Sequence, residues 1–197
     1  MKLVDLDAAE LRVLGCLVEK QRTTPDAYPL SLNALRLACN QSTNRDPVVD
    51  YEEATIRDAL AGLSRRGWAR LASGRGSRAV KYRHLLEEAL GLDGPELSLL
   101  AVLVLRGPQT PGELKQRSER LHAFASVADV IETLERLGVR ELVARLPRRP
   151  GQKEERYTHR LGEEPPDATA RPEADRLGAL ERQLAELEER VAALEGR

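Results

Sequence analysis

The stretch ATIRDALAGLSRRG at residues 54–67 recurs in altered form as ASVADVIETLERLG at residues 125–138. Both stretches carry apolar side chains at helical spacing, and both end in a glycine that suits a left-handed helix cap. Two further pairs match in the same order: LRVLGCLVEK (11–20) with LSLLAVLVLR (97–106), and KYRHLL (81–86) with RYTHRL (156–161). This ordered self-similarity predicts two copies of one small domain.

Each copy has the pattern of three helices followed by a β-hairpin. In the first copy we expect helices to begin at Asp7, near Ser31 and at Asp50, where short polar side chains can cap them. Glu53 would close a capping box with Asp50. In the second copy the first helix is expected to start after DGPE (93–96) and the next two at Thr110 and Ser126, and the third helix is expected to end at Gly138.

The order of elements predicts the fold class. We expect an α+β protein, mainly α with small β-hairpins, built as tandem winged helix-turn-helix domains at residues 1–90 and 91–162. In that layout the third helix is the recognition helix and the hairpin is the wing. The composition agrees, because 41% of residues are hydrophobic but only 3% are aromatic, as in a core of leucine-rich helices.

The C-terminal segment differs in composition from both copies. Residues 163–174 are rich in proline and acidic side chains and are expected to form an unstructured linker. Residues 175–197 repeat apolar side chains at alternating spacings of three and four, which predicts a coiled-coil helix that reinforces a parallel homodimer. The expected dimerisation residues are Leu177, Leu180, Leu184, Leu187, Val191 and Leu194.

Sequence signatures of enzymes are missing. The segment SGRGSR (73–78) lacks the ending of a phosphate-binding P-loop, and neither HExxH nor G-x-S-x-G occurs. His84 and His159 occupy equivalent positions in the two hairpins, which favours a shared structural role over catalysis. We therefore expect no catalytic residues, no cofactor and no metal site.

The sequence also predicts the compartment. No run of apolar residues is long enough to span a membrane, and acidic residues follow the initial Met1 where a signal peptide would be apolar. Cys16 and Cys39 lie within apolar helical patterns, as buried thiols do in a reducing compartment. We expect a cytoplasmic protein without a membrane partner.

One long stretch resembles a known family. The run RVLGCLVEKQRTTPDAYPLSLNALRLACNQSTNRDPVVDYEEATIRDAL (12–60), with the hairpin and the leucine-rich tail, is similar to the YceH-like family of bacterial proteins over nearly the whole chain. The resemblance implies tandem winged-helix domains in a cytoplasmic protein. It implies no particular biochemical activity.

The polar stretch LACNQSTNRDPVVDY (37–51) connects the second helix to the expected recognition helix. One interpretation is local: Asn40 caps the second helix, while Asn44 and Arg45 brace a long loop. The other is that side chains of this loop bind phosphates or base edges. The first interpretation is favoured, and the second stays open.

Charge gives the clearest functional signal. Residues 59–86 contain seven Arg and Lys but no Asp or Glu, although they follow the acidic first turn of the expected recognition helix. Arg65 and Arg66 would complement the dipole at the end of that helix. The candidate nucleic-acid-binding residues are Asn44, Arg45, Arg57, Arg75, Arg78, Lys81 and Arg83.

These patterns lead to two functional hypotheses. The first is a dimeric regulatory protein that binds double-stranded DNA through the first domain and its basic wing. The alternative is a non-enzymatic scaffold whose tandem winged helices bind a protein partner, an analogy based on fold alone.

Overall fold

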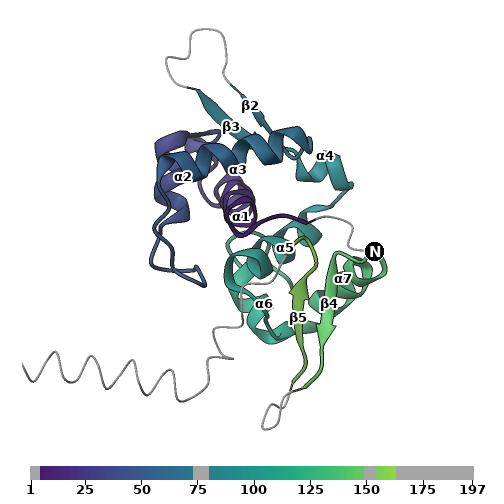
Figure 1. Cartoon of the computed structure of the whole chain (residues 1–197). Helices are drawn as coiled ribbons and strands as arrows, with labels where there is room; N and C mark the ends of the chain where they lie inside the picture. The colour runs from purple at the N-terminus through teal and green to yellow at the C-terminus, as the bar shows by residue number, and fades with distance from the viewer. Residues whose placement is uncertain (1–4, 73–79, 149–153, 163–197) are drawn as a thin grey trace, which may run out of the picture. The chain divides into compact units, whose positions relative to one another are not determined.

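The computed structural model describes residues 5–72, 80–148 and 154–162 (Figure 1). All of them belong to one compact unit, Met1–Pro165. The expected linker and coiled-coil helix, with all six dimerisation residues, lie outside the described residues, as do Arg75 and Arg78 of the hairpin tip.

Helices and short antiparallel strands make up the described chain, so the mixed α+β class is confirmed. In order, the elements are α1 (Ala8–Thr23), the 3-10 turn η1 (Pro25–Ala27), β1 (Leu30–Ser31), α2 (Leu32–Cys39), α3 (Glu53–Arg65), β2 (Ala69–Leu71), β3 (Lys81–His84), α4 (Leu86–Leu90), α5 (Gly94–Arg106), α6 (Pro111–Ser118), α7 (Val127–Val139), β4 (Val143–Leu146) and β5 (Arg156–His159). We call α1 to β3 the first repeat and α5 to β5 the second repeat; α4 connects them.

The two repeats share their strand pairing. In the first repeat β3 lies between β1 and β2, whereas β4 and β5 form a two-stranded sheet in the second. Strand β1, which the sequence pattern does not predict, pairs Leu30 with Tyr82. The second repeat keeps this contact as a single bridge between Gln109 and Tyr157. The internal repeat therefore extends to a strand that is only two residues long in one copy and one residue long in the other.

Backbone hydrogen bonds where α3 and α7 lead into their hairpins are also equivalent. The amide of Trp68 donates to the carbonyl of Leu63 at 2.9 Å, and the amide of Leu142 donates to that of Leu137 at 3.0 Å. The carbonyls of Trp68 and Leu142 accept in turn from Leu85 and Arg160. The same turn thus joins the third helix to the hairpin in both repeats.

Most expected helix starts are confirmed. Asp7, Thr110 and Ser126 each cap a helix, and each forms a capping box with the residue three positions later. Ser31 caps α2 by accepting from the amide of Ala34. The capping side chains in the sequence were therefore sufficient to predict where these four helices start.

The expected start of α3 is wrong. This helix begins at Glu53 after Glu52, and no side chain caps it. The Asp50 carboxylate accepts a hydrogen bond from the Asn40 side chain at 3.2 Å, and the same amide group binds both the N–H and the carbonyl of Tyr51. Asn40 thereby holds residues 50 and 51 outside the helix.

The expected cap at Gly138 is also wrong. Gly138 lies within α7, which ends at Val139. The left-handed conformation is adopted by Glu141, with φ of 57°, whereas Gly67 adopts it in the first repeat with φ of 73°. The two third helices therefore end differently despite their aligned glycines.

Helices α1 and α5 form the centre of the unit. In Figure 1, α1 lies between α3 and α5, and it packs against both. Every residue from Glu10 to Val18 is buried, as is every residue from Glu96 to Leu103. Burial on all sides is expected when one face of a helix meets its own repeat and the opposite face meets the other repeat.

Gly15 allows the two central helices to approach closely. A Cβ atom at this position would lie 2.9 Å from Cγ and Cδ2 of the buried Leu105 and 3.1 Å from Cγ1 of Val104. By contrast, a Cβ at Gly112, in the first turn of α6, would meet nothing within 4 Å. The absence of a side chain at residue 15 is therefore a packing requirement.

The first prediction compares these two glycines. We expect Gly15→Ala to lower the free energy of unfolding by about 1–3 kcal/mol, because the added methyl overpacks the α1–α5 contact. The control Gly112→Ala should be neutral or stabilising by up to about 1 kcal/mol, because alanine favours the helix. Urea denaturation followed by circular dichroism measures both, and equal effects of the two substitutions would contradict the packing argument.

His84 and His159 have the same structural role. Nδ1 of each ring accepts a hydrogen bond from the backbone amide two residues later, Leu86 at 3.2 Å and Leu161 at 3.4 Å. Nε2 of His84 lies 2.6 Å from the side-chain oxygen of Gln21, to which it must donate. Burial lowers the pKa of both histidines from 6.5 to about 4, so both rings are neutral at pH 7.

The second prediction follows from these pKa values. The unfolded chain takes up protons on both histidines as the pH falls below 6.5, whereas the folded chain does so only near pH 4. The free energy of unfolding is therefore not reduced by these histidines above pH 6.5. It falls by roughly 3 kcal/mol for each histidine as the pH decreases from 6.5 to 4. Urea denaturation at several pH values should show this loss in the native protein and a much shallower one in the His84→Asn/His159→Asn variant. An equally steep loss in the variant would contradict the assignment.

Candidate nucleic-acid interface and inter-repeat pocket

The loop between α2 and α3, residues 40–52, is held by a buried arginine. The Arg45 side chain is 0% exposed, and its guanidinium pairs with Glu19 of α1 through contacts of 3.1 and 2.5 Å. Nε of Arg45 also donates to the carbonyl of Ala38 at 3.1 Å. Burial alone would lower the pKa of Arg45, but the bond to Glu19 raises it above its ordinary value. This geometry supports the bracing interpretation and places Arg45 away from any surface that could meet DNA.

The same loop also contacts the second repeat. The amide of Asp46 donates to the carbonyl of Leu105 at 2.9 Å, and the side-chain oxygen of Asn44 accepts from Arg106. Arg12 of α1 donates to the carbonyls of Cys39 and Pro47 at 3.2 and 2.5 Å. The loop therefore does more than join two helices, because it ties the first repeat to the end of α5.

The third prediction concerns Arg45. Its replacement by alanine leaves the mostly buried Glu19 carboxylate with Lys20 alone, at 3.8 Å. It also removes the donors to the carbonyls of Ala38 and Asn44, so we expect a loss of about 3–5 kcal/mol in the free energy of unfolding. Arg57→Ala is the control, because Arg57 forms an exposed pair with Glu53, worth at most about 1 kcal/mol. Chemical denaturation of both variants tests this, and a loss for Arg45→Ala no larger than for Arg57→Ala would contradict the bracing role.

The other predicted nucleic-acid contacts lie apart from this loop. Arg57 is exposed on α3 and pairs with Glu53 at 2.9 Å. Arg83 pairs with Glu88, just beyond the hairpin, at 2.6 Å, and Lys81 is half-buried on the same strand. Arg57, Lys81 and Arg83 are thus placed on the first repeat, but at least Arg57 and Arg83 already have acidic partners.

The hairpin register reveals a cationic pair that sequence spacing did not identify. Arg70 of β2 lies directly opposite Arg83 of β3. Directly opposed residues of antiparallel strands project from the same face, where like charges destabilise each other. Arg70 is exposed and, within the described residues, forms no ion pair. Only the strand register could have shown that these two arginines are neighbours.

One face of α3 is exposed and carries small side chains. Ile56, Ala59, Leu60 and Leu63 are buried against the rest of the repeat. Arg65 ends the exposed face without an ion-pair partner among the described residues. The exposed face consists of Glu53, Ala54, Arg57, Asp58, Ala61, Ser64 and Arg65. Its small residues would let another backbone approach the helix closely.

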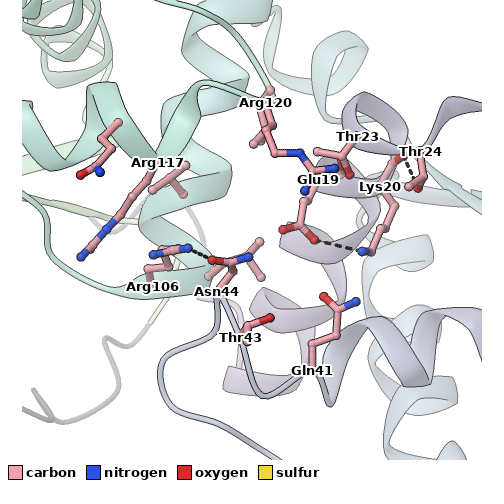
Figure 2. A pocket seen from close by; sticks show the side chains of 14 residues that line it. Glu19, Lys20, Thr23, Thr24, Gln41, Thr43, Asn44, Arg106, Arg117 and Arg120 are labelled. Carbon is pink, nitrogen blue, oxygen red and sulfur yellow. Dashed lines mark hydrogen bonds and ion pairs between the residues drawn. The ribbon is translucent and has the colours of Figure 1, made fainter.

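A pocket of about 600 Å³ lies between the two repeats. One wall carries Arg106 of α5 together with Arg117 and Arg120 of the α6 region, and the other carries Glu19 and Lys20 of α1 (Figure 2). The rest of the lining combines uncharged polar side chains with the apolar side chains of Val102, Leu105 and Leu121; the polar ones include Thr23, Gln41, Thr43, Asn44 and Gln116. The positions of basic residues along the sequence did not indicate this site, because the residues that line it come from distant segments.

No metal-binding cluster of histidine, cysteine, aspartate or glutamate occurs in the part of the chain that the structure describes. Cys16 and Cys39 are both free and buried, as expected. A hydrogen bond with Cys16, together with burial, raises the pKa of the Cys39 thiol. Among the described helices, none is long and apolar enough to cross a membrane.

The sequence comparisons identify the family. Residues 6–152 match the family model described as "Protein of unknown function, DUF480". The chain is 52% identical to a UPF0502 protein of Geotalea uraniireducens, over 95% of this chain and 89% of the relative. It is 51% identical to a UPF0502 protein of Geobacter metallireducens, over 96% and 87% of the two chains, and 47% identical to one of Opitutus terrae, over 96% and 83%.

The chain belongs to the DUF480 family, and the three bacterial relatives above carry the name UPF0502 protein. This agrees with the expected bacterial family without an assigned activity. The more specific YceH-like name stays a prediction.

Proposed function

We propose that the protein is a non-enzymatic, regulatory DNA-binding protein of the cytoplasm, built from tandem winged-helix domains. In this proposal α3 is the recognition helix and the β2–β3 hairpin is the wing. The order of three helices and a hairpin in each repeat supports it. Double-stranded DNA would be bound by the first repeat of each subunit of a homodimer.

The observation that carries the proposal is the opposition of Arg70 and Arg83 on the hairpin. Two cations facing each other across a strand pair cost stability unless an anion lies between or beside them. Glu88 compensates for one of the two, which leaves a cation on the wing for a phosphate. In Figure 1 strands β2 and β3 extend past α3, as the strands of a wing that follows a DNA backbone must.

The exposed face of α3 adds a second contact surface. Ala61 and Ser64 present little bulk, so a phosphate backbone could approach the end of the helix near Arg65. The first turn is less suitable, because Glu52 and Glu53 are exposed there. Carboxylates repel phosphates, so we propose backbone contacts at the end of the helix and on the wing, with little reading of base edges.

The fourth prediction tests this arrangement. Replacing Arg65 and Arg70 with glutamine should weaken binding of a 20-base-pair duplex at least about 10-fold at low salt, because two phosphate contacts are removed. It should also reduce the log-log dependence of affinity on salt by about 0.9 for each lost contact. Fluorescence anisotropy between 50 and 200 mM KCl measures both quantities.

The matched control is Arg145→Gln, which removes an exposed arginine from the hairpin of the second repeat. It should leave affinity and slope nearly unchanged. Absence of duplex binding by the native protein, or an equal loss in the control, would refute the role of the first repeat.

A second candidate function is a protein-interaction scaffold. Exposed apolar side chains on the first repeat favour it: Leu37 of α2 is 57% exposed, Val48 of the loop 58% and Leu71 of the hairpin 61%. Apolar contacts depend little on ionic strength, whereas phosphate contacts weaken steeply as salt increases. The salt series of the fourth prediction therefore distinguishes the two functions.

A further inference from the structure

The pocket between the repeats has a strongly cationic lining. Arg106, Arg117, Arg120 and Lys20 line a space whose one carboxylate is Glu19. Figure 2 shows Glu19 and Lys20 on the wall opposite Arg106. Glu19 pairs with the buried Arg45 at 2.5 Å and with Lys20 at 3.8 Å, so these two cations already share its charge. Arg106, Arg117 and Arg120 therefore remain as the lining cations that no carboxylate of the pocket neutralises.

The three lining arginines have no ion-pair partner among the carboxylates of the pocket itself. Among the described residues Arg120 has no ion-pair or hydrogen-bond partner, and Arg106 donates to the neutral side chain of Asn44. Arg117 pairs with Glu113, at 3.2 Å, which does not line the pocket. Burial, and then the nearby charge of Arg117, lower the pKa of Arg106. An anion bound here would relieve this repulsion.

The uncharged lining narrows the class of ligand. Thr23, Gln41, Thr43 and Gln116 offer hydroxyl and amide groups, which suit a polar body that carries hydroxyls. No aromatic side chain lines the pocket, so it offers no stacking surface for a nucleobase. The volume of about 600 Å³ is typical of small-molecule sites and larger than a single phosphate needs.

We propose that this pocket binds a small, non-aromatic phosphorylated molecule, with the phosphate held by Arg106, Arg117 and Arg120 and the hydroxylated body facing Thr23, Gln41 and Thr43. Such a ligand contacts both repeats and the 40–52 loop at once. Because it binds only where these segments are folded together, it also stabilises the unit. The inference concerns a site separate from the hairpin and holds whether or not the protein binds DNA.

Isothermal titration calorimetry of the full chain at 150 mM KCl tests the proposal, with ribose 5-phosphate and inorganic phosphate as probes. Ribose 5-phosphate should bind at one saturable site and more tightly than inorganic phosphate, because it also occupies the hydroxyl-binding wall. Arg106→Gln and Arg120→Gln should each weaken its binding at least about 10-fold, since each removes a charge-assisted hydrogen bond. Arg120 is exposed, so its variant folds normally even if Arg106→Gln is destabilised.

The control variant Arg57→Gln removes an exposed arginine from α3, away from the pocket, and should bind ribose 5-phosphate like the native protein. Three results would overturn the proposal. They are no saturable binding of ribose 5-phosphate up to about 10 mM, unchanged binding in Arg120→Gln, or a loss of binding in Arg57→Gln equal to that in the pocket variants. Equal affinity for inorganic phosphate and ribose 5-phosphate would overturn the assignment of the hydroxylated body.

Discussion

The packing of α1 against α5 is the contact on which the other features depend. Each helix is buried along its whole central part because it belongs to two cores at once, that of its own repeat and that of the interface. Gly15 sets how closely the helices approach. This approach brings the end of α5 to the 40–52 loop and the end of α1 to the α6 region, which creates the pocket. Loop and pocket are thus consequences of one helix contact.

The cationic side chains of the described residues fall into three groups that differ in their surroundings. Arg45 and Arg12 are buried and hold the loop through a carboxylate and backbone carbonyls. Arg70 and Arg65 lie exposed on the first repeat, and the pocket arginines lie between the repeats. A net charge of −1 for the whole chain conceals these three groups, each of which has a different consequence for stability or binding.

The sequence predicted the features that depend on local chemistry. Caps at Asp7, Thr110 and Ser126 and the positions of both hairpins follow from side chains a few residues apart. The start of α3 was misplaced because Asn40, ten residues away, binds Asp50 and Tyr51. The burial of Arg45 and the opposition of Arg70 and Arg83 depend on tertiary contacts and strand register. No periodicity in the sequence encodes either, so most of the candidate site required the structure.

The contact between α1 and α5 joins equivalent helices of the two repeats, as their aligned sequences at 11–20 and 97–106 show. Two separate copies of a single repeat would use such a self-complementary face to form a homodimer. Here the covalent connection through α4 makes that association intramolecular, so it does not weaken on dilution. Opening one repeat would expose the leucine-rich helix of the other, and the two repeats should therefore lose their structure in a single cooperative transition.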